Sequence, residues 1–104
     1  MRRSEETILA EIAAFAPRGG NWRALDSLLA ELFAETPSVR AVPALLAVFE
    51  RFPTEDGAGV LWGIVHGLEA LPYDYCTPLR VSQERTPSLM AGVMLRRLAN
   101  AVRS

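Results

Sequence analysis

Residues 60–71 have the sequence VLWGIVHGLEAL, and the rest of the chain can be placed around this stretch. Apolar side chains recur in it at the steps of three and four residues that are typical of an α-helix, and they cover most of the helix circumference. Pro72 ends the stretch, and a turn at residues 54–59 with two glycines precedes it. A helix that is apolar on most sides is typically buried at the centre of a bundle, so we expect residues 60–71 to form the central helix.

Two amphipathic segments begin the chain. The first runs from Ser4, a predicted N-cap, to Ala16, and Pro17 ends it. Asn21 is predicted to cap the second segment, whose apolar side chains recur at steps of one and three residues along one face. That stripe consists of Trp22, Leu25, Leu28, Leu29, Leu32 and Phe33.

A third helix is predicted over residues 42–51, directly before the turn. Pro43 is tolerated in its first turn, and Pro53 stops it. A helix that began at Ser38 would instead place Pro43 in its interior, so the start of this helix stays open at this point.

The C-terminal part of the chain is predicted to form two more helices. A short one is expected between Tyr73 and Gln83, with Pro78 near its beginning. For the last helix, Thr86 is the predicted N-cap and Pro87 the first helical residue. The apolar residues that follow at helical spacing are Leu89, Met90, Val93, Met94, Leu95, Leu98 and Val102.

No stretch alternates apolar and polar residues in the way a β-strand does, so the predicted fold is all-α. We expect a compact bundle of five to six short helices in a single domain over residues 1–104. The sequences LLAEL at 28–32 and LLAVF at 45–49 superpose at an offset of 17, which raises a HEAT-like α-solenoid as a second arrangement. Because Leu and Ala are common in this chain, chance is the better explanation of that similarity.

The predicted core collects the large side chains of these helices. Trp62 is expected to be largely buried in the central helix, and Trp62→Ala is expected to cost about 3–5 kcal/mol of stability. The core residues predicted in this way are Trp22, Phe33, Phe49, Trp62, His66 and Leu95.

The composition argues against several classes of protein. A net charge of −1 does not fit a dedicated nucleic-acid binder, which is usually strongly basic. Cys76 is the single cysteine, so no internal disulfide can form. Glutamates interrupt the apolar start, and no apolar run approaches the roughly 20 residues that span a bilayer, so we expect a cytoplasmic protein without a membrane partner.

Few residues are arranged for catalysis. His66 and Glu69 could form an acid–base pair or half of a metal site, but no second histidine or cysteine pair completes one. A dyad of Cys76 with His66 has no orienting third residue at a recognisable spacing. Gly57-Ala58-Gly59 lacks the Gly-Lys-Ser/Thr of a phosphate-binding loop. We therefore expect a protein without enzymatic activity, cofactor or metal.

The charges are unevenly distributed along the chain. Residues 1–75 carry 6 Arg against 11 acidic residues, a net charge of −5, whereas residues 76–104 carry 5 Arg against one Glu, a net charge of +4. The acidic part could meet a basic partner, or the two parts could pair within the folded chain. The candidate partner-binding acids are Glu50, Glu55, Asp56, Glu69 and Asp74, although Asp56 could equally cap the helix at 60–71.

The segment FERFPTEDGAGVLWGIVHGLEALPYDY, residues 49–75, resembles small bacterial immunity proteins that accompany the toxins of polymorphic-toxin and contact-dependent growth-inhibition systems. Ser82, Arg85, Pro87 and residues 94–101 extend the resemblance. The matching positions within the segment are Phe49, Glu50, Arg51, Pro53, Asp56, Gly57, Gly59, Val60, Trp62, His66, Gly67, Glu69 and Tyr73.

The resemblance implies a cytoplasmic protein that binds and neutralises a cognate protein toxin. If that toxin is a nuclease, its substrate groove is expected to be basic, and the candidate acids could cover it. The other function that the helical pattern fits is a scaffold or adaptor module that binds proteins without a toxin partner.

Overall fold

Six α-helices and one 3₁₀ turn make up the computed structural model, which describes residues 3–103 and, of these, the side chains of residues 3–101. No strand is present among the residues described, so the all-α prediction is confirmed. The elements are α1 (Glu5–Ala14), α2 (Arg23–Leu32), α3 (Ala41–Arg51), η1 (Gly57–Gly59), α4 (Leu61–Ala70), α5 (Cys76–Arg85) and α6 (Leu89–Arg103).

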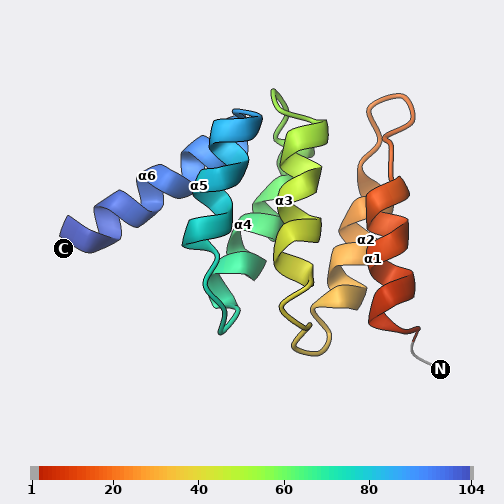
Figure 1. Cartoon of the computed structure of the whole chain (residues 1–104). Helices are drawn as coiled ribbons and strands as arrows, with labels where there is room; N and C mark the ends of the chain where they lie inside the picture. The colour runs from red at the N-terminus through yellow and green to blue at the C-terminus, as the bar shows by residue number, and fades with distance from the viewer. Residues whose placement is uncertain (1–2, 104) are drawn as a thin grey trace.

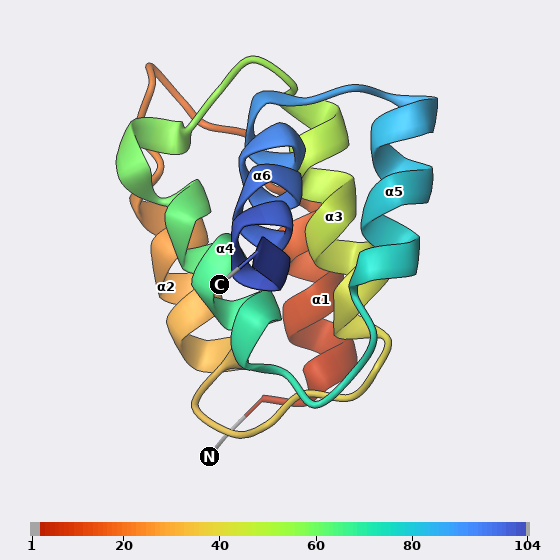
Figure 2. The same cartoon turned by 90° about the vertical axis from the view of Figure 1, so that its left-hand side faces the viewer.

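The helices form two layers of three (Figures 1 and 2). α1, α3 and α5 lie side by side in one layer, and α2, α4 and α6 lie side by side in the other. Each odd-numbered helix turns back into the even-numbered helix that follows it, so the chain is a stack of three helical hairpins. α6 extends beyond the end of this stack (Figure 1).

The stack has a repeat, but not the one that the sequence suggested. The odd-numbered helices begin at residues 5, 41 and 76, so one hairpin follows the previous one after 36 and then 35 residues. An offset of 17 instead relates α2 to α3, which belong to different layers. The similarity of LLAEL and LLAVF therefore reflects two helices with buried leucines and not a structural repeat.

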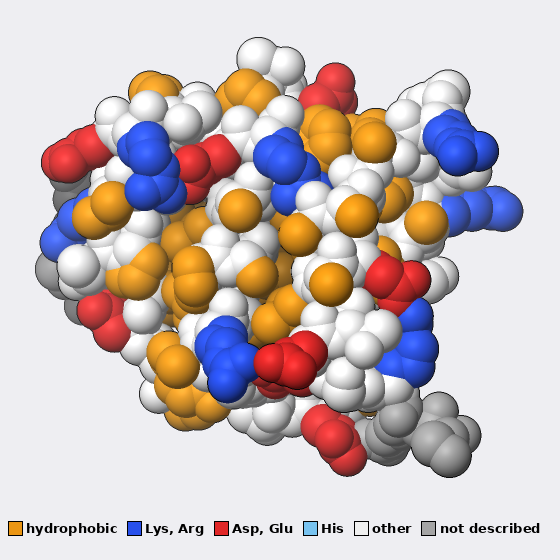
Figure 3. All heavy atoms as spheres, turned by 45° about the vertical axis from the view of Figure 1, so that its right-hand side comes forward, with side chains coloured by type: hydrophobic (Ala, Val, Ile, Leu, Met, Phe, Trp, Pro, Cys, Tyr) orange, Lys and Arg blue, Asp and Glu red, His pale blue; other side chains and the backbone are white. Residues whose placement is uncertain are grey.

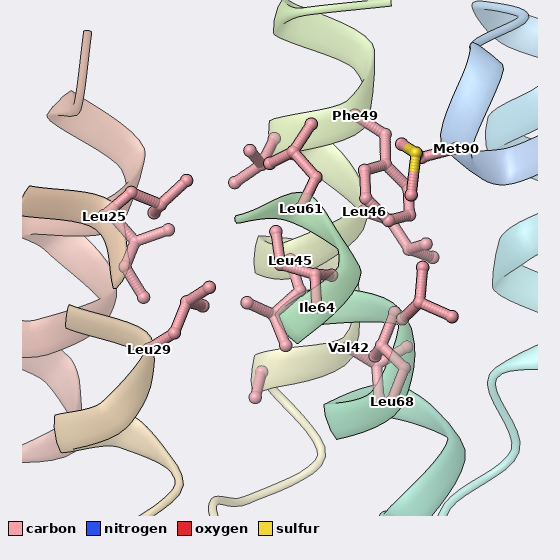
Figure 4. Close-up of a cluster of buried hydrophobic side chains, with 14 of the residues drawn as sticks. Leu25, Leu29, Val42, Leu45, Leu46, Phe49, Leu61, Ile64, Leu68 and Met90 are labelled. Carbon is pink, nitrogen blue, oxygen red and sulfur yellow. The ribbon is translucent and has the colours of Figure 1, made fainter. Parts of the chain in front are cut away.

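The core lies between the layers, around the middle helix of each (Figure 4). α3 buries most of its length, and α4 buries the side that faces it. The buried residues of α3 are Ala41, Val42, Leu45, Leu46, Val48 and Phe49, and those of α4 are Leu61, Ile64, Val65 and Leu68. The prediction of a central helix at residues 60–71 is thus right for the position of α4, but α3 is buried over more of its surface.

The predicted start of the first helix and the preferred start of the third agree with the structure. The Ser4 side chain accepts a hydrogen bond from the Thr7 amide as the N-cap of α1. α3 begins at Ala41, which leaves Pro43 in its first turn, so the alternative start at Ser38 is wrong. Asn21 accepts a hydrogen bond from the Arg23 amide, but it lies one residue before the N-cap position of α2.

Two further predicted caps are wrong. Ser88, and not Thr86, caps α6, because the Ser88 hydroxyl accepts a hydrogen bond from the Ala91 amide and the helix begins one residue after it. Thr86 ends α5 instead, with its amide donating to the Ser82 carbonyl. Asp56 accepts from the Ala58 amide and so caps η1, whereas α4 begins without a side-chain cap.

An aromatic cluster joins the loop between α1 and α2 to the loop between α3 and α4. The Trp22 ring lies 5.6 Å from the Phe15 ring and 5.1 Å from the Phe52 ring, measured between centroids. Arg51 adds a polar link, since its Nη2 donates to the carbonyl oxygens of Ile12 at 2.9 Å and Phe15 at 3.1 Å. This guanidinium therefore satisfies carbonyls at the C-terminal end of α1.

Gly57 packs directly against Trp22 of this cluster, and a substitution there tests the packing. Its φ is +62°, and a Cβ atom there would lie 3.0 Å from Trp22 Cε3 and 3.1 Å from Leu61 Cγ. Gly19 is the matched control, because its φ is +57° and nothing lies within 4 Å of its Cβ position. We expect Gly57→Ala to destabilise the protein by about 1–2 kcal/mol more than Gly19→Ala, which carries the backbone strain alone. Urea unfolding measures the difference, and equal losses for the two variants would contradict this packing.

Candidate partner-binding surface

The five candidate acids do not form one patch. Glu50, Glu55 and Asp56 follow one another at the end of α3 and in the loop after it, whereas Glu69 and Asp74 lie at the other end of α4. α4 has 10 residues, so it separates the two groups by about 15 Å. A partner that met all five carboxylates would have to span the length of the helix.

Glu50 is bound within the chain. Its carboxylate accepts hydrogen bonds from Arg85 Nε at 2.9 Å, Arg85 Nη2 at 2.7 Å and the Ser82 hydroxyl at 2.9 Å. The hydrogen bonds from Arg85, followed by the one from Ser82, lower the pKa of Glu50 below its ordinary value. This carboxylate therefore holds α5 against α3.

Glu69 is bound in the same way by the last helix. Arg97 donates to it from Nε at 2.7 Å and from Nη2 at 2.9 Å. These bonds from Arg97 lower the pKa of Glu69. The pairs Glu50–Arg85 and Glu69–Arg97 both join the acidic part of the sequence to its basic end, so the alternative of pairing within the folded chain is confirmed for them.

The remaining acids lie in loops. Asp74 accepts hydrogen bonds from the amides of Cys76 at 2.9 Å and Thr77 at 3.4 Å at the start of α5, and the bonds from Thr77 lower its pKa most. Asp56 caps η1, as described above. Glu55 is exposed beside it. The exposed acids Glu55, Asp56 and Asp74 are therefore the part of the acidic set that remains open to a basic partner.

The predicted core residues have three different environments. Trp22 and Phe49 are buried, and Phe33 and Leu95 are half-buried against the core. Trp62 is also only half-buried, and His66, with 64% of its side chain exposed, does not belong to the core. The prediction is wrong for His66 because an apolar sequence on most sides of a helix does not reveal which side packs. Ile64 and Leu68 define the packed side of α4, and His66 lies away from it.

Trp62 and His66 instead form part of a surface group with Glu69 and Arg97, which we call the Trp62 group. The Trp62 and His66 rings lie 5.8 Å apart with an interplanar angle of 32°. The Arg97 guanidinium lies 5.9 Å from the Trp62 ring centroid while it binds Glu69. Tryptophan and arginine are the residue types that most often dominate binding energy in protein interfaces.

An open hollow of about 660 Å³ lies beside the Trp62 group, between the end of α2 and α4. The Phe33 ring forms one wall, and the backbone of α4 at Gly63 and Gly67 forms the floor. A Cβ atom on Gly67 would lie only 2.2 Å from Phe33 Cζ, so the glycine is what allows the ring to lie there. Sequence reasoning missed this hollow, although two glycines four residues apart in a helix were the available signal.

His66 and Glu69 are the two residues considered for chemistry that lie close together. His66 Nδ1 lies 3.8 Å from Glu69 Oε1, and the Glu69 carboxylate is already engaged by Arg97. Within residues 3–101, no group of three or more His, Cys, Asp and Glu side chains could hold a metal ion.

None of the helices in the described part of the chain is long and apolar enough to cross a membrane. Comparisons with protein-family models, with curated proteins and with solved structures gave no match.

The two environments of Trp62 and Phe49 predict different stability losses. Phe49→Ala removes a completely buried side chain and is expected to cost about 3–5 kcal/mol. Trp62→Ala is expected to cost about half as much, because part of the ring already faces water, which corrects the value expected from the sequence. Chemical unfolding of both variants measures the two costs. A loss for Trp62→Ala as large as that for Phe49→Ala would show that Trp62 belongs to the core.

The Glu69–Arg97 pair predicts a pH-dependent stability. Because folding lowers the pKa of Glu69, the stabilisation is present above the unfolded value of about 4.3 and is lost as the pH falls through the lower folded pKa. Glu69→Gln is therefore expected to lower the free energy of unfolding at pH 7 and to approach the wild type in acid. Urea unfolding of both proteins between pH 7 and acid measures the difference in their free energies of unfolding. Adding Arg97→Gln tests the partner, since the second substitution is expected to cost little once Glu69 is gone.

Proposed function

We propose that this chain is an immunity protein that binds a cognate bacterial toxin in the cytoplasm and neutralises it by blocking its active site or substrate groove. The proposal begins with the resemblance of residues 49–75 to such proteins. The structural observation that supports it is the position of two of the matching residues, Trp62 and His66, on the open side of α4. The exposed parts of these two side chains are available to a partner.

The Trp62 group suits this role because it is held in place before any partner arrives. Trp62, His66 and Glu69 project from one helix, and Arg97 reaches them from α6 through two hydrogen bonds to Glu69. Ordering side chains during binding subtracts from affinity, so a pre-organised surface binds more tightly than a mobile one. An inhibitor that must hold a toxin inactive needs this property.

The electrostatic part of the proposal now rests on the three exposed candidate acids. If the toxin is a nuclease, its basic groove would be met by Glu55 and Asp56 between α3 and α4 or by Asp74 before α5, because Glu50 and Glu69 are neutralised by Arg85 and Arg97. A variant with Glu55 and Asp56 both changed to Ala separates this contribution from that of the Trp62 group.

A scaffold or adaptor module without a toxin partner is the second candidate. The stack of three helical hairpins supports it, since stacked hairpins present extended surfaces to other proteins. The neighbouring gene discriminates the two functions. A toxin domain encoded next to this chain favours the immunity protein, and an enzyme or secretion-machinery operon favours the adaptor.

Co-expression with the product of the neighbouring gene tests the immunity function. The wild-type chain is expected to co-purify with that protein and to restore growth to cells that produce it. His66→Ala is expected to weaken binding by about tenfold or more and to reduce protection without changing the melting temperature, because His66 is exposed. Arg80→Ala is the matched control, since Arg80 is exposed on α5 and should leave protection intact.

Absence of both co-purification and growth rescue with the wild-type chain would refute the immunity function. Protection that survives His66→Ala undiminished would refute the role given to the Trp62 group.

A further inference from the structure

We propose that the outer face of the α1–α2 hairpin binds a second copy of this chain. A twofold axis relates the two copies, and each places Arg18 and Arg23 over the acidic end of the other. The inference goes beyond the proposed function and does not depend on it, because the Trp62 group belongs to α4 and α6.

The α1–α2 hairpin is covered on one side only. α1 packs against α2 and α3, and α2 packs against α1 and α4, so in the described part of the chain no helix covers their outer side (Figure 1). The outer side of a terminal hairpin in such a stack is usually polar. Figure 3 shows the α1 side of the molecule, where hydrophobic side chains lie exposed among Arg, Asp and Glu side chains. An open hollow of about 400 Å³ between α1 and α2, which we call the apolar hollow, is lined by Ala14, Phe15, Ala16, Ala24 and Leu28.

The end of the hairpin at the α1–α2 loop carries unpaired positive charge. Arg18 lies in this loop and borders the apolar hollow, and Arg23 is the first residue of α2. Both side chains belong to exposed residues, and within residues 3–101 neither guanidinium has an ion-pair or hydrogen-bond partner. Two arginines at this end are therefore available to carboxylates outside the chain.

The other end of the hairpin carries an excess of carboxylates. A second hollow of about 290 Å³, which we call the acidic hollow, is bordered by three glutamates, Glu5, Glu31 and Glu35, and by a single arginine, Arg3. Arg3 donates to Glu31 from Nε at 2.8 Å and from Nη2 at 2.6 Å, and the same guanidinium also binds Glu11. Because one cation is shared between two carboxylates, this end attracts a further guanidinium, whose planar fork matches a carboxylate with two hydrogen bonds.

A twofold axis perpendicular to the face brings the opposite ends together. The two hollows adjoin, since Glu11 borders the apolar hollow and shares Arg3 with Glu31 of the acidic one. A half turn of one copy therefore places Arg18 and Arg23 over the acidic hollow of the other, and the reciprocal contact forms at the same time. The two apolar hollows then face one another between these charged contacts.

This distribution of charge selects a second copy as the occupant. A face with positive charge at one end and negative charge at the other is complementary to itself, and complementary charge is what chooses a partner and fixes its orientation. A twofold contact uses the same face on both copies, so it closes after two copies. The predicted assembly is a dimer and not an open chain of copies.

Sedimentation equilibrium of the full chain tests the dimer. The wild-type chain is expected to show a monomer–dimer equilibrium with a Kd that rises at high salt, because salt screens the charged contacts. Arg18→Glu combined with Arg23→Glu is expected to raise the Kd about tenfold or more, since it places carboxylates over the acidic hollow. Glu31→Arg combined with Glu35→Arg is expected to do the same from the other side.

A mixture of these two double variants makes the sharpest comparison. In a mixed dimer the introduced glutamates of one chain meet the introduced arginines of the other, and the unchanged ends meet as in the wild type. We therefore expect the mixture to dimerise under conditions in which each double variant alone is monomeric. Arg80→Glu combined with Arg96→Glu is the matched control, because both arginines are exposed on α5 and α6 and should leave the Kd unchanged.

Dilution of the ¹⁵N-labelled wild-type chain locates the contact without any substitution. The amide signals of Ala14, Ala24 and Glu31 are expected to shift with concentration, and those of His66 and Arg80 are expected to stay in place. This measurement decides the matter if a charge-reversed variant does not fold.

Four results would overturn the inference. They are a wild-type chain that stays monomeric up to about 1 mM, a dimer that survives reversal of Arg18 and Arg23, a mixture of folded double variants that does not dimerise, and concentration-dependent shifts confined to another face. None of these measurements includes a toxin, and the growth-rescue test does not require a dimer, so the dimer and the immunity function can fail separately.

Discussion

α3 lies between α1 and α5 in one layer and packs against α4 and α6 of the other. Its first nine residues carry no charge, and six of them are buried. The two residues that follow then hold its neighbours: Glu50 binds Ser82 and Arg85 of α5, and Arg51 caps the end of α1. The burial of α3 thus sets the position of the helices packed around it. Glu50 and Arg51 in its last turn then fix how α5 and α1 lie along its length.

This placement of α3 determines what α4 can offer. α4 turns Leu61, Ile64 and Leu68 toward the core and needs no packing partner on its opposite side. That side is closed in part by Phe33, which lies over Gly67, and in part by Arg97 over Trp62. Between the two remain the hollow and the exposed His66. One side of α4 therefore packs in the core, and the other presents Trp62, His66 and the Glu69–Arg97 pair.

Local signals in the sequence were sufficient for much of the fold. Helical spacing and prolines predicted every helix, and Pro43 and Pro53 placed α3 almost to the residue. Caps were less predictable. Thr86 followed by Pro87 fits an N-cap as well as Ser88 followed by Leu89 does, and only the path of the folded chain decides at which of the two α6 begins. Which side of α4 packs, and which arginine meets which carboxylate, depends on contacts between residues about 30 positions apart. The contact of Phe33 with Gly67 is of this kind, so the two glycines of α4 signalled a gap in the helix surface but not the ring that forms its wall.

The proposed partner surface requires Trp62 to face the partner, and fluorescence measures this directly. In a Trp22→Phe variant, Trp62 is the single tryptophan. Its emission in the free protein is expected to be quenched by acrylamide, because the ring is half-buried, and to shift to shorter wavelength and lose that quenching when the neighbouring gene product binds. An emission spectrum and a quenching constant that stay unchanged in a complex shown to have formed would contradict the assignment of this surface.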